Sequence, residues 1–180
     1  HVIGELAGRD RAFHAFLVGI VSAVPGVDLE RFASLPDSAT ARRQLSLGEA
    51  PTVMCTGHLY AGRGADIFLT LAKSLPRVQF VWVGGRPEDI EKWKHRVESG
   101  NVTFTGFIPN LKLPLYQAAA DILLMPYSRS IMGSSGSADS AAVASPMKMF
   151  EYMAVGRMIV SSDLPVIREV LNERNAVFCN

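Results

Sequence analysis

Two charged side chains, Lys148 and Glu151, interrupt an otherwise apolar stretch, residues 145–156 (SPMKMFEYMAVG). Because they stand three positions apart, a helix would project both from one side. Burying them as an ion pair would add little net stability. We therefore expect both to reach a ligand, Lys148 to bind negative charge and Glu151 to accept a hydrogen bond from a sugar hydroxyl. A structural Lys148–Glu151 pair is the alternative.

The ends of this stretch favour a helix. Ser145 is a suitable N-cap, Pro146 suits the first helical position, and Gly156 falls where the helix would stop. The free amides and the positive dipole end at the start of such a helix attract an anionic group such as phosphate.

A second candidate is the glycine-rich segment 57–64 (GHLYAGRG), which nearly matches a P-loop. Arg63 replaces the P-loop lysine and Gly64 replaces the Ser/Thr that would bind magnesium, so an ATPase is not indicated. The fork-shaped guanidinium of Arg63 suits a diphosphate, although a solvated arginine on a tight turn would give the same pattern. His58 could hydrogen-bond a phosphate or have a structural role.

Short apolar runs alternate with amphipathic stretches from residue 52 onward. Continuous apolar strands that alternate with helices indicate a parallel sheet covered on both faces, so we predict a doubly wound, Rossmann-like α/β domain. The predicted strands are 52–57, 78–85, 101–107, 121–127, 157–163 and 176–180, and the predicted helices are 64–75, 87–98, 113–120 and 145–156.

Ligands bind at the carboxyl ends of the strands in such sheets. The loops after the first two predicted strands contain Gly57 and Gly84, which we include among the predicted ligand-binding residues. A dehydrogenase is not indicated, because no Gly-x-Gly-x-x-Gly motif follows any strand.

The domain is expected to span residues 24–180. Residues 1–23 supply no strand-helix repeat of their own, so we read them as the end of an upstream or interdomain region and suspect a fragment of a longer enzyme. The Gly/Ser/Ala-rich segment 128–144 is expected to be a functional loop, with a plain surface loop as the alternative.

Composition indicates a compact globular domain with a small-molecule partner. Of 180 residues, 48% are hydrophobic and 19% charged, and the net charge of +1 gives no overall attraction for nucleic acid or an anionic membrane. Cys55 and Cys179 lie in apolar runs and are expected to be buried, reduced thiols, which fits a cytoplasmic setting. No metal-ligand spacing occurs. The apolar block after Arg9 mimics a signal peptide, but His14 interrupts it.

Residues 145–171 (SPMKMFEYMAVGRMIVSSDLPVIREVL) resemble the most distinctive segment of the retaining glycosyltransferases of family 4, nucleotide-sugar enzymes of the GT-B fold. The resemblance extends over nearly all of 24–180. It includes VPGVDLERF, similar to the interdomain segment of that family, TGHLYAGRGADIFLTLA, similar to its first glycine-rich loop, and NVTFTGFIP and AAADILLMPY, similar to its base-binding and sugar-proximal strands.

The resemblance implies roles for particular residues. Arg63 takes the place of the phosphate-binding lysine of the family, and Glu151 that of its ribose-binding glutamate. The amides around Ser145, Met147 and Lys148 correspond to those that hold the diphosphate. In the same way, Phe107 and Ile108 are implied to flank the base. Two positions depart from the family: Val143 stands where members often have a first glutamate, and His58 where many have an arginine.

The activity implied is metal-independent transfer of a sugar from a nucleotide diphosphate to an acceptor, with retention and without a cofactor. Arg63 and Lys148 would be the catalytic residues, because they would stabilise charge on the leaving diphosphate. The acceptor, a sugar, lipid or other molecule, would bind an N-terminal domain, and a peripheral membrane contact of the whole enzyme is compatible with this. A GT-B nucleotide-sugar 2-epimerase and a non-catalytic nucleotide or phosphosugar binding module are the alternatives.

Overall fold

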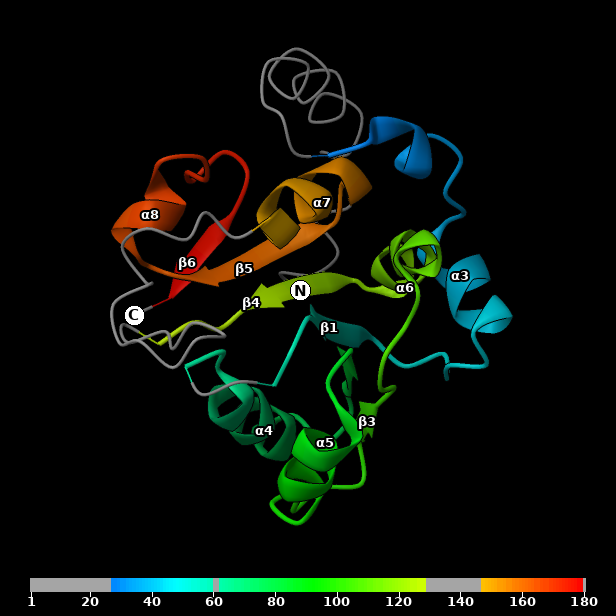
Figure 1. Ribbon diagram of the computed structural model, residues 1–180, viewed down its shortest axis with the longest axis vertical. Coiled ribbons are helices and arrows are strands. Elements are labelled where there is room, and N and C mark those ends of the chain that lie inside the picture. The colour runs from blue at the N-terminus through cyan, green and yellow to red at the C-terminus, as the bar shows by residue number, and fades with distance from the viewer. Residues whose placement is uncertain (1–26, 60–61, 129–146, 180) are drawn as a thin grey trace.

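The computed structural model describes residues 27–59, 62–128 and 147–179, which form one parallel β-sheet between two layers of helices (Figure 1). The strand order is β3-β2-β1-β4-β5-β6, and every strand pairing is parallel. This confirms the predicted doubly wound sheet. The strands are β1 (Thr52–Thr56), β2 (Gln79–Val83), β3 (Val102–Phe104), β4 (Ile122–Met125), β5 (Met158–Ser162) and β6 (Val177–Cys179).

The central strands β1 and β4 are largely apolar because both of their faces are covered. In β1, Val53 and Cys55 pack into the cluster beneath the sheet, whereas Met54 packs into the cluster on the opposite face. All five residues of β1 are buried. A strand with one solvated face would alternate apolar and polar residues instead.

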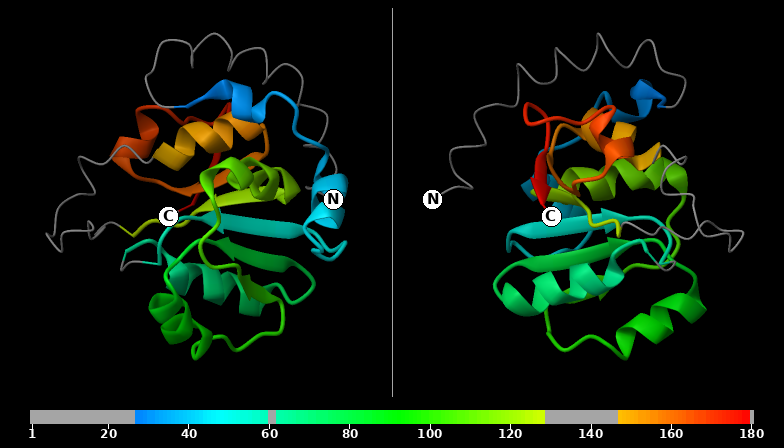
Figure 2. Two further views of the ribbon diagram at one scale, coloured as in Figure 1. Left: turned by 45° about the vertical axis from the view of Figure 1, so that its right-hand side comes forward. Right: turned by 90° about the vertical axis from the view of Figure 1, so that its left-hand side faces the viewer.

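Helices lie on both faces of the sheet (Figure 2). Buried side chains of α4 and α5 belong to one core cluster, and those of α3, α6, α7 and α8 belong to the other. The bounds of the helices are η2 (Leu29–Phe32), α3 (Ser38–Gln44), α4 (Ala65–Ser74), α5 (Pro87–Lys94), η3 (Asn110–Lys112), α6 (Leu113–Ala119), α7 (Met147–Val155) and α8 (Pro165–Arg168).

Every strand and helix predicted from residue 52 onward is present, and the end of α7 is as expected. The backbone of Gly156 takes a φ of +71°, and its amide donates to the carbonyl of Met153 at 3.1 Å. The sequence did not predict α3, α8 or the short 3-10 turns η2 and η3. The predicted upstream region 1–23, all of the predicted loop 128–144 except Ser128, and Ser145 lie outside the described residues.

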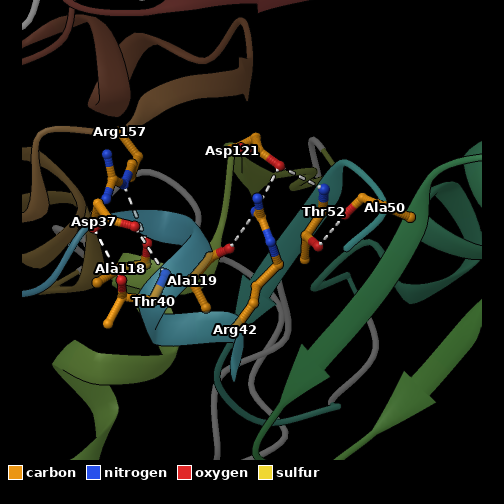
Figure 3. A network of polar contacts seen from close by, with 9 residues as sticks. All are labelled: Asp37, Thr40, Arg42, Ala50, Thr52, Ala118, Ala119, Asp121 and Arg157. Carbon is orange, nitrogen blue, oxygen red and sulfur yellow. Dashed lines mark hydrogen bonds and ion pairs between the residues drawn. The ribbon is translucent and has the colours of Figure 1, made fainter. Parts of the chain in front are cut away.

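A polar network fastens α3 to the amino edge of the sheet (Figure 3). Arg42 donates to the carboxylate of Asp121 at 2.9 Å and to the carbonyl of Ala119 at 3.0 Å. Asp121 in turn accepts from the amide of Thr52, the first residue of β1, at 2.8 Å. The network therefore fixes the starts of β1 and β4, at the edge opposite the strand ends where a ligand is expected.

Candidate functional site

The strand order reverses between β1 and β4, so their carboxyl ends border the crevice in which α/β sheets of this kind bind ligands. Gly64 brings the loop after β1 against the loop after β4. Its φ is +80°, and a Cβ there would lie 1.6 Å from the carbonyl oxygen of Pro126. The amide of Ser128 also donates to the carbonyl of Gly62, at 3.1 Å. Only glycine permits this contact, and it holds the two loops together.

Lys148, in the first turn of α7, reaches the end of β1. Its Nζ donates to the carbonyl of Thr56 at 2.8 Å and lies 4.8 Å from the centre of the Tyr127 ring. Burial disfavours the charge, but the pKa of Lys148 is nevertheless raised, because Cys55, Tyr127 and Tyr152 lie beside the amine. Lys148 therefore carries a positive charge at neutral pH.

Arg63 approaches the same tyrosine from the loop after β1. Its Cζ lies 5.5 Å from the centre of the Tyr127 ring, and its Nη1 lies 3.4 Å from the Tyr127 hydroxyl. The Nε of Arg63 is buried and donates to no acceptor within the described part of the chain. Tyr127, itself only 3% exposed, thus lies between two cations.

Within the described part of the chain, no carboxylate forms an ion pair with either cation. The ion pairs found among residues 27–59, 62–128 and 147–179 include neither Lys148 nor Arg63. Cations withdrawn from water are normally paired, so two unpaired ones at a ligand-binding edge indicate a site for an anion. Gly57 adjoins this site, since a Cβ there would lie 4.0 Å from the Nζ of Lys148.

Buried polar groups support the end of β1 from below. The hydroxyl of Tyr152 accepts from the amide of Thr56 at 2.8 Å, and burial raises the pKa of Tyr152, so the hydroxyl stays neutral. The thiol of Cys55 lies 3.7 Å from the Nζ of Lys148, and burial raises its pKa as well, although Lys148 opposes the shift. Cys55 is a buried free thiol, as predicted.

Cys179 is free but exposed, so the expectation that it is buried was wrong. It lies on β6, where alternate residues are exposed.

Glu151 contacts different partners from Lys148. Its Oε2 accepts from the Nε2 of Gln117 at 3.0 Å, and its Oε1 lies 3.9 Å from the Nη1 of Arg31. The alternative of a Lys148–Glu151 ion pair is therefore not what the structure contains. About a fifth of the Glu151 side chain, 20%, is exposed, so the carboxylate is accessible to a ligand.

The remaining predicted residues lie along the same edge. Phe107 follows β3 and is 78% exposed, whereas Ile108 is half-buried and packs against the core. Gly84 follows β2 with a φ of +110°, and a Cβ there would lie 2.7 Å from the carbonyl oxygen of Gly57. That carbonyl accepts from the indole Nε1 of Trp82 at 2.9 Å. His58 is exposed in the loop after β1.

The structure describes two of the predicted anion-binding positions incompletely or not at all. Met147 is the first residue of α7, and Ser145 lies outside the described residues. Within the part of the chain that the structure describes, no three His, Cys, Asp or Glu side chains gather where they could hold a metal ion. The helices described there include none that is long and apolar enough to cross a membrane.

Sequence reasoning missed Tyr127, Tyr152, Arg31 and Gln117. Tyr127 comes shortly after β4, one of the two strands between which the strand order reverses. Its place at that strand end was a signal in the sequence. The other three gave no signal, because each meets the site through contacts between residues 34 to 120 positions apart.

Comparisons with known proteins identify the family. A family model described as glycosyl transferases group 1 matches residues 50–180. The GDP-mannose-dependent alpha-(1-6)-phosphatidylinositol monomannoside mannosyltransferase of Mycobacterium tuberculosis (strain CDC 1551 / Oshkosh) is 38% identical over 110 residues, 57% of this chain and 29% of that protein. The alpha-galactosylglucosyldiacylglycerol synthase of Streptococcus pneumoniae is 25% identical over 162 residues, 84% of this chain and 40% of that protein.

Among solved structures, Anabaena Alr3699/HepE in complex with UDP and glucose is similar, with a TM-score of 0.66 and 19% identity, over 86% of this chain and 41% of that one. At this identity the likeness shows the fold alone. The chain thus spans less than a third of the mycobacterial relative and about two fifths of the streptococcal one.

Proposed function

This chain belongs to the group 1 glycosyl transferases, and from that premise we propose that it binds the nucleotide diphosphate sugar of a glycosyltransferase. The observation that carries the proposal is the pair of cations, Lys148 and Arg63, that meet at Tyr127 at the reversal of the sheet, where no carboxylate of the described residues pairs with them. A diphosphate supplies the missing negative charge, and the first amides of α7 add the positive end of a helix dipole.

The rest of the donor would extend from this diphosphate site along the carboxyl edge. Glu151 accepts hydrogen bonds from the ribose, and the base lies between Phe107 and Ile108. Exposure of Phe107 supports this placement, since an aromatic ring left largely in solvent is available for stacking.

In the intact enzyme, the bond between the anomeric carbon and the diphosphate oxygen breaks, and the anomeric carbon bonds to an acceptor hydroxyl oxygen, which loses its proton. Negative charge develops on the nucleotide diphosphate as it leaves. Arg63 and Lys148 are placed to stabilise that charge, so we propose that transfer needs no metal ion. Retention of the anomeric configuration belongs to the same proposal. The acceptor, a sugar or lipid, would bind the remainder of the longer protein.

The donor is tested first by calorimetry with the full-length protein. GDP-mannose is the first donor to try because the mycobacterial relative is named for it, and UDP-glucose is the second because Alr3699/HepE was crystallised with it. We expect micromolar to millimolar binding of at least one donor, unchanged by EDTA. Failure of UDP, GDP and ADP sugars to bind would refute the proposal.

Product analysis tests the reaction. NMR of the product formed with a suitable acceptor should show the anomeric configuration of the donor, and inversion would refute the proposed stereochemistry. Incubation with a UDP-sugar alone distinguishes a 2-epimerase, because an epimerase converts the sugar without any acceptor.

A further inference from the structure

Arg31 connects three segments that are far apart in the sequence. It lies on η2, before the first strand of the sheet, and its Nη2 donates to the carbonyl of Asn110 in the loop after β3. Its Nη1 points to the Oε1 of Glu151 on α7. Asn110 comes two residues after Ile108, so Arg31 stands between the residues proposed for the base and the carboxylate proposed for the ribose.

The distance between Arg31 and Glu151 fits a bridging oxygen better than a direct hydrogen bond. Nη1 and Oε1 are 3.9 Å apart, too far for a hydrogen bond, which requires about 2.7–3.2 Å. Two hydrogen bonds of about 2.8 Å that meet at one oxygen at roughly a right angle span about 4 Å. A hydroxyl can accept from the guanidinium and donate to the carboxylate at the same time.

The surrounding groups are also short of partners. The Nε of Arg31 and the Oε1 of Gln117 are buried and have no hydrogen-bond partner in the described part of the chain. Gln117 uses its Nε2 to hold the far oxygen of Glu151, at 3.0 Å, which leaves Oε1 of Glu151 directed at Arg31. The side chains of Arg31 and Glu151 are 22% and 20% exposed, so a ligand can reach the space between them.

We propose that one ribose hydroxyl of the nucleotide bridges Arg31 and Glu151, accepting from Nη1 and donating to Oε1. This makes Arg31 a residue that selects ribose over deoxyribose, supplied by the segment before the sheet. The inference rests on the proposed nucleotide site, but it concerns a different part of the ligand from the diphosphate cations.

The test compares UDP and GDP with their 2′-deoxy and 3′-deoxy analogues, by calorimetry on the full-length protein. In the unmodified protein, removing one of the two hydroxyls should weaken binding about 10-fold or more, since a charge-assisted hydrogen-bond pair is lost. In Arg31→Met that penalty should shrink several-fold but not vanish, because the hydrogen bond to Glu151 remains, while the diphosphate-to-nucleoside ratio stays unchanged. Arg31→Lys keeps a charged donor and should restore part of the discrimination, which a purely structural role would not produce.

Arg77→Met provides the matched control, because Arg77 is exposed in the turn before β2, at the opposite edge of the sheet. It should bind all the nucleotides as the unmodified protein does. If Arg31→Met weakens the ribose and both deoxyribose forms equally, or if the unmodified protein does not discriminate between them, the bridge is wrong and the donor site stands. If no nucleotide binds the unmodified protein, both proposals fail.

Discussion

Replacing Lys148 with methionine separates a ligand-binding role from a structural one. Methionine fills a similar volume but removes the charge and the hydrogen bond from Nζ to the carbonyl of Thr56, which is 2.8 Å long. Losing that charge-assisted bond costs about 1.5–3 kcal/mol of folding free energy, and relief from the desolvation of the ammonium group offsets only part of it, since the pKa of Lys148 is raised in the fold. The free energy of unfolding should therefore fall by less than about 3 kcal/mol.

Ligand binding should respond in a way that depends on the phosphate groups. A charge-assisted hydrogen bond contributes about 1.5–3 kcal/mol, so Lys148→Met should weaken binding of a nucleoside diphosphate roughly 10-fold to 100-fold. Binding of the corresponding nucleoside should change little, because it has no phosphate. Calorimetry and urea unfolding give the two quantities, with Lys94→Met at the exposed end of α5 as the control. A loss of 3 kcal/mol or more in stability, with the diphosphate-to-nucleoside ratio unchanged, would show that the lysine is structural.

Three further substitutions test neighbouring features. Arg63→Ala should weaken binding of the diphosphate by about 10-fold or more and of the nucleoside far less, and equal losses would reject its phosphate role. Gly64→Ala should destabilise the fold by at least about 2 kcal/mol in urea unfolding, because φ is +80° and Cβ would meet Pro126, whereas Gly100→Ala, with nothing within 4 Å, should not. Two hydrogen bonds from Arg168 hold the pKa of Asp163 below 3.8, so the stability that they add is present above that pH and is lost as the pH falls further. In thermal melts, Asp163→Asn should therefore reduce the loss of stability with falling pH. An unchanged pH dependence would contradict the reasoning.

The sheet could be predicted from the sequence because its strands are buried on both faces. Runs such as 52–57 and 121–127 are too short for helices and largely apolar without alternation, and this pattern is typical of covered parallel strands. The helix α3 escaped notice because only Ala41 of its seven residues is buried. Its start is set by Asp37, whose side chain accepts from the amide of Thr40 at 2.8 Å, a signal that a search for N-caps could have found.

The site was predictable in part. Arg63, Lys148 and Glu151 could be found because each belongs to a short sequence pattern, a loop after a strand or a helix that begins at a strand end. The sequence could not show that Lys148 and Glu151 contact different partners, since those partners come from β1, α6 and η2, elements far from α7 in the sequence. The packing of Tyr127 between two cations, and the approach of Arg31 to Glu151, likewise depend on the tertiary fold.

The hydrogen bond from the indole of Trp82 to the carbonyl of Gly57 gives the domain an intrinsic optical reporter. Trp82 is completely buried, yet its only polar atom touches the first residue of the loop beside Lys148. The chain has two tryptophans, and the other, Trp93, stacks on Arg96 at 4.4 Å on the far helix α5. In a Trp93→Phe variant, tryptophan fluorescence comes from Trp82 alone. A shift of the Gly57 backbone on ligand binding would then change the emission of that one residue.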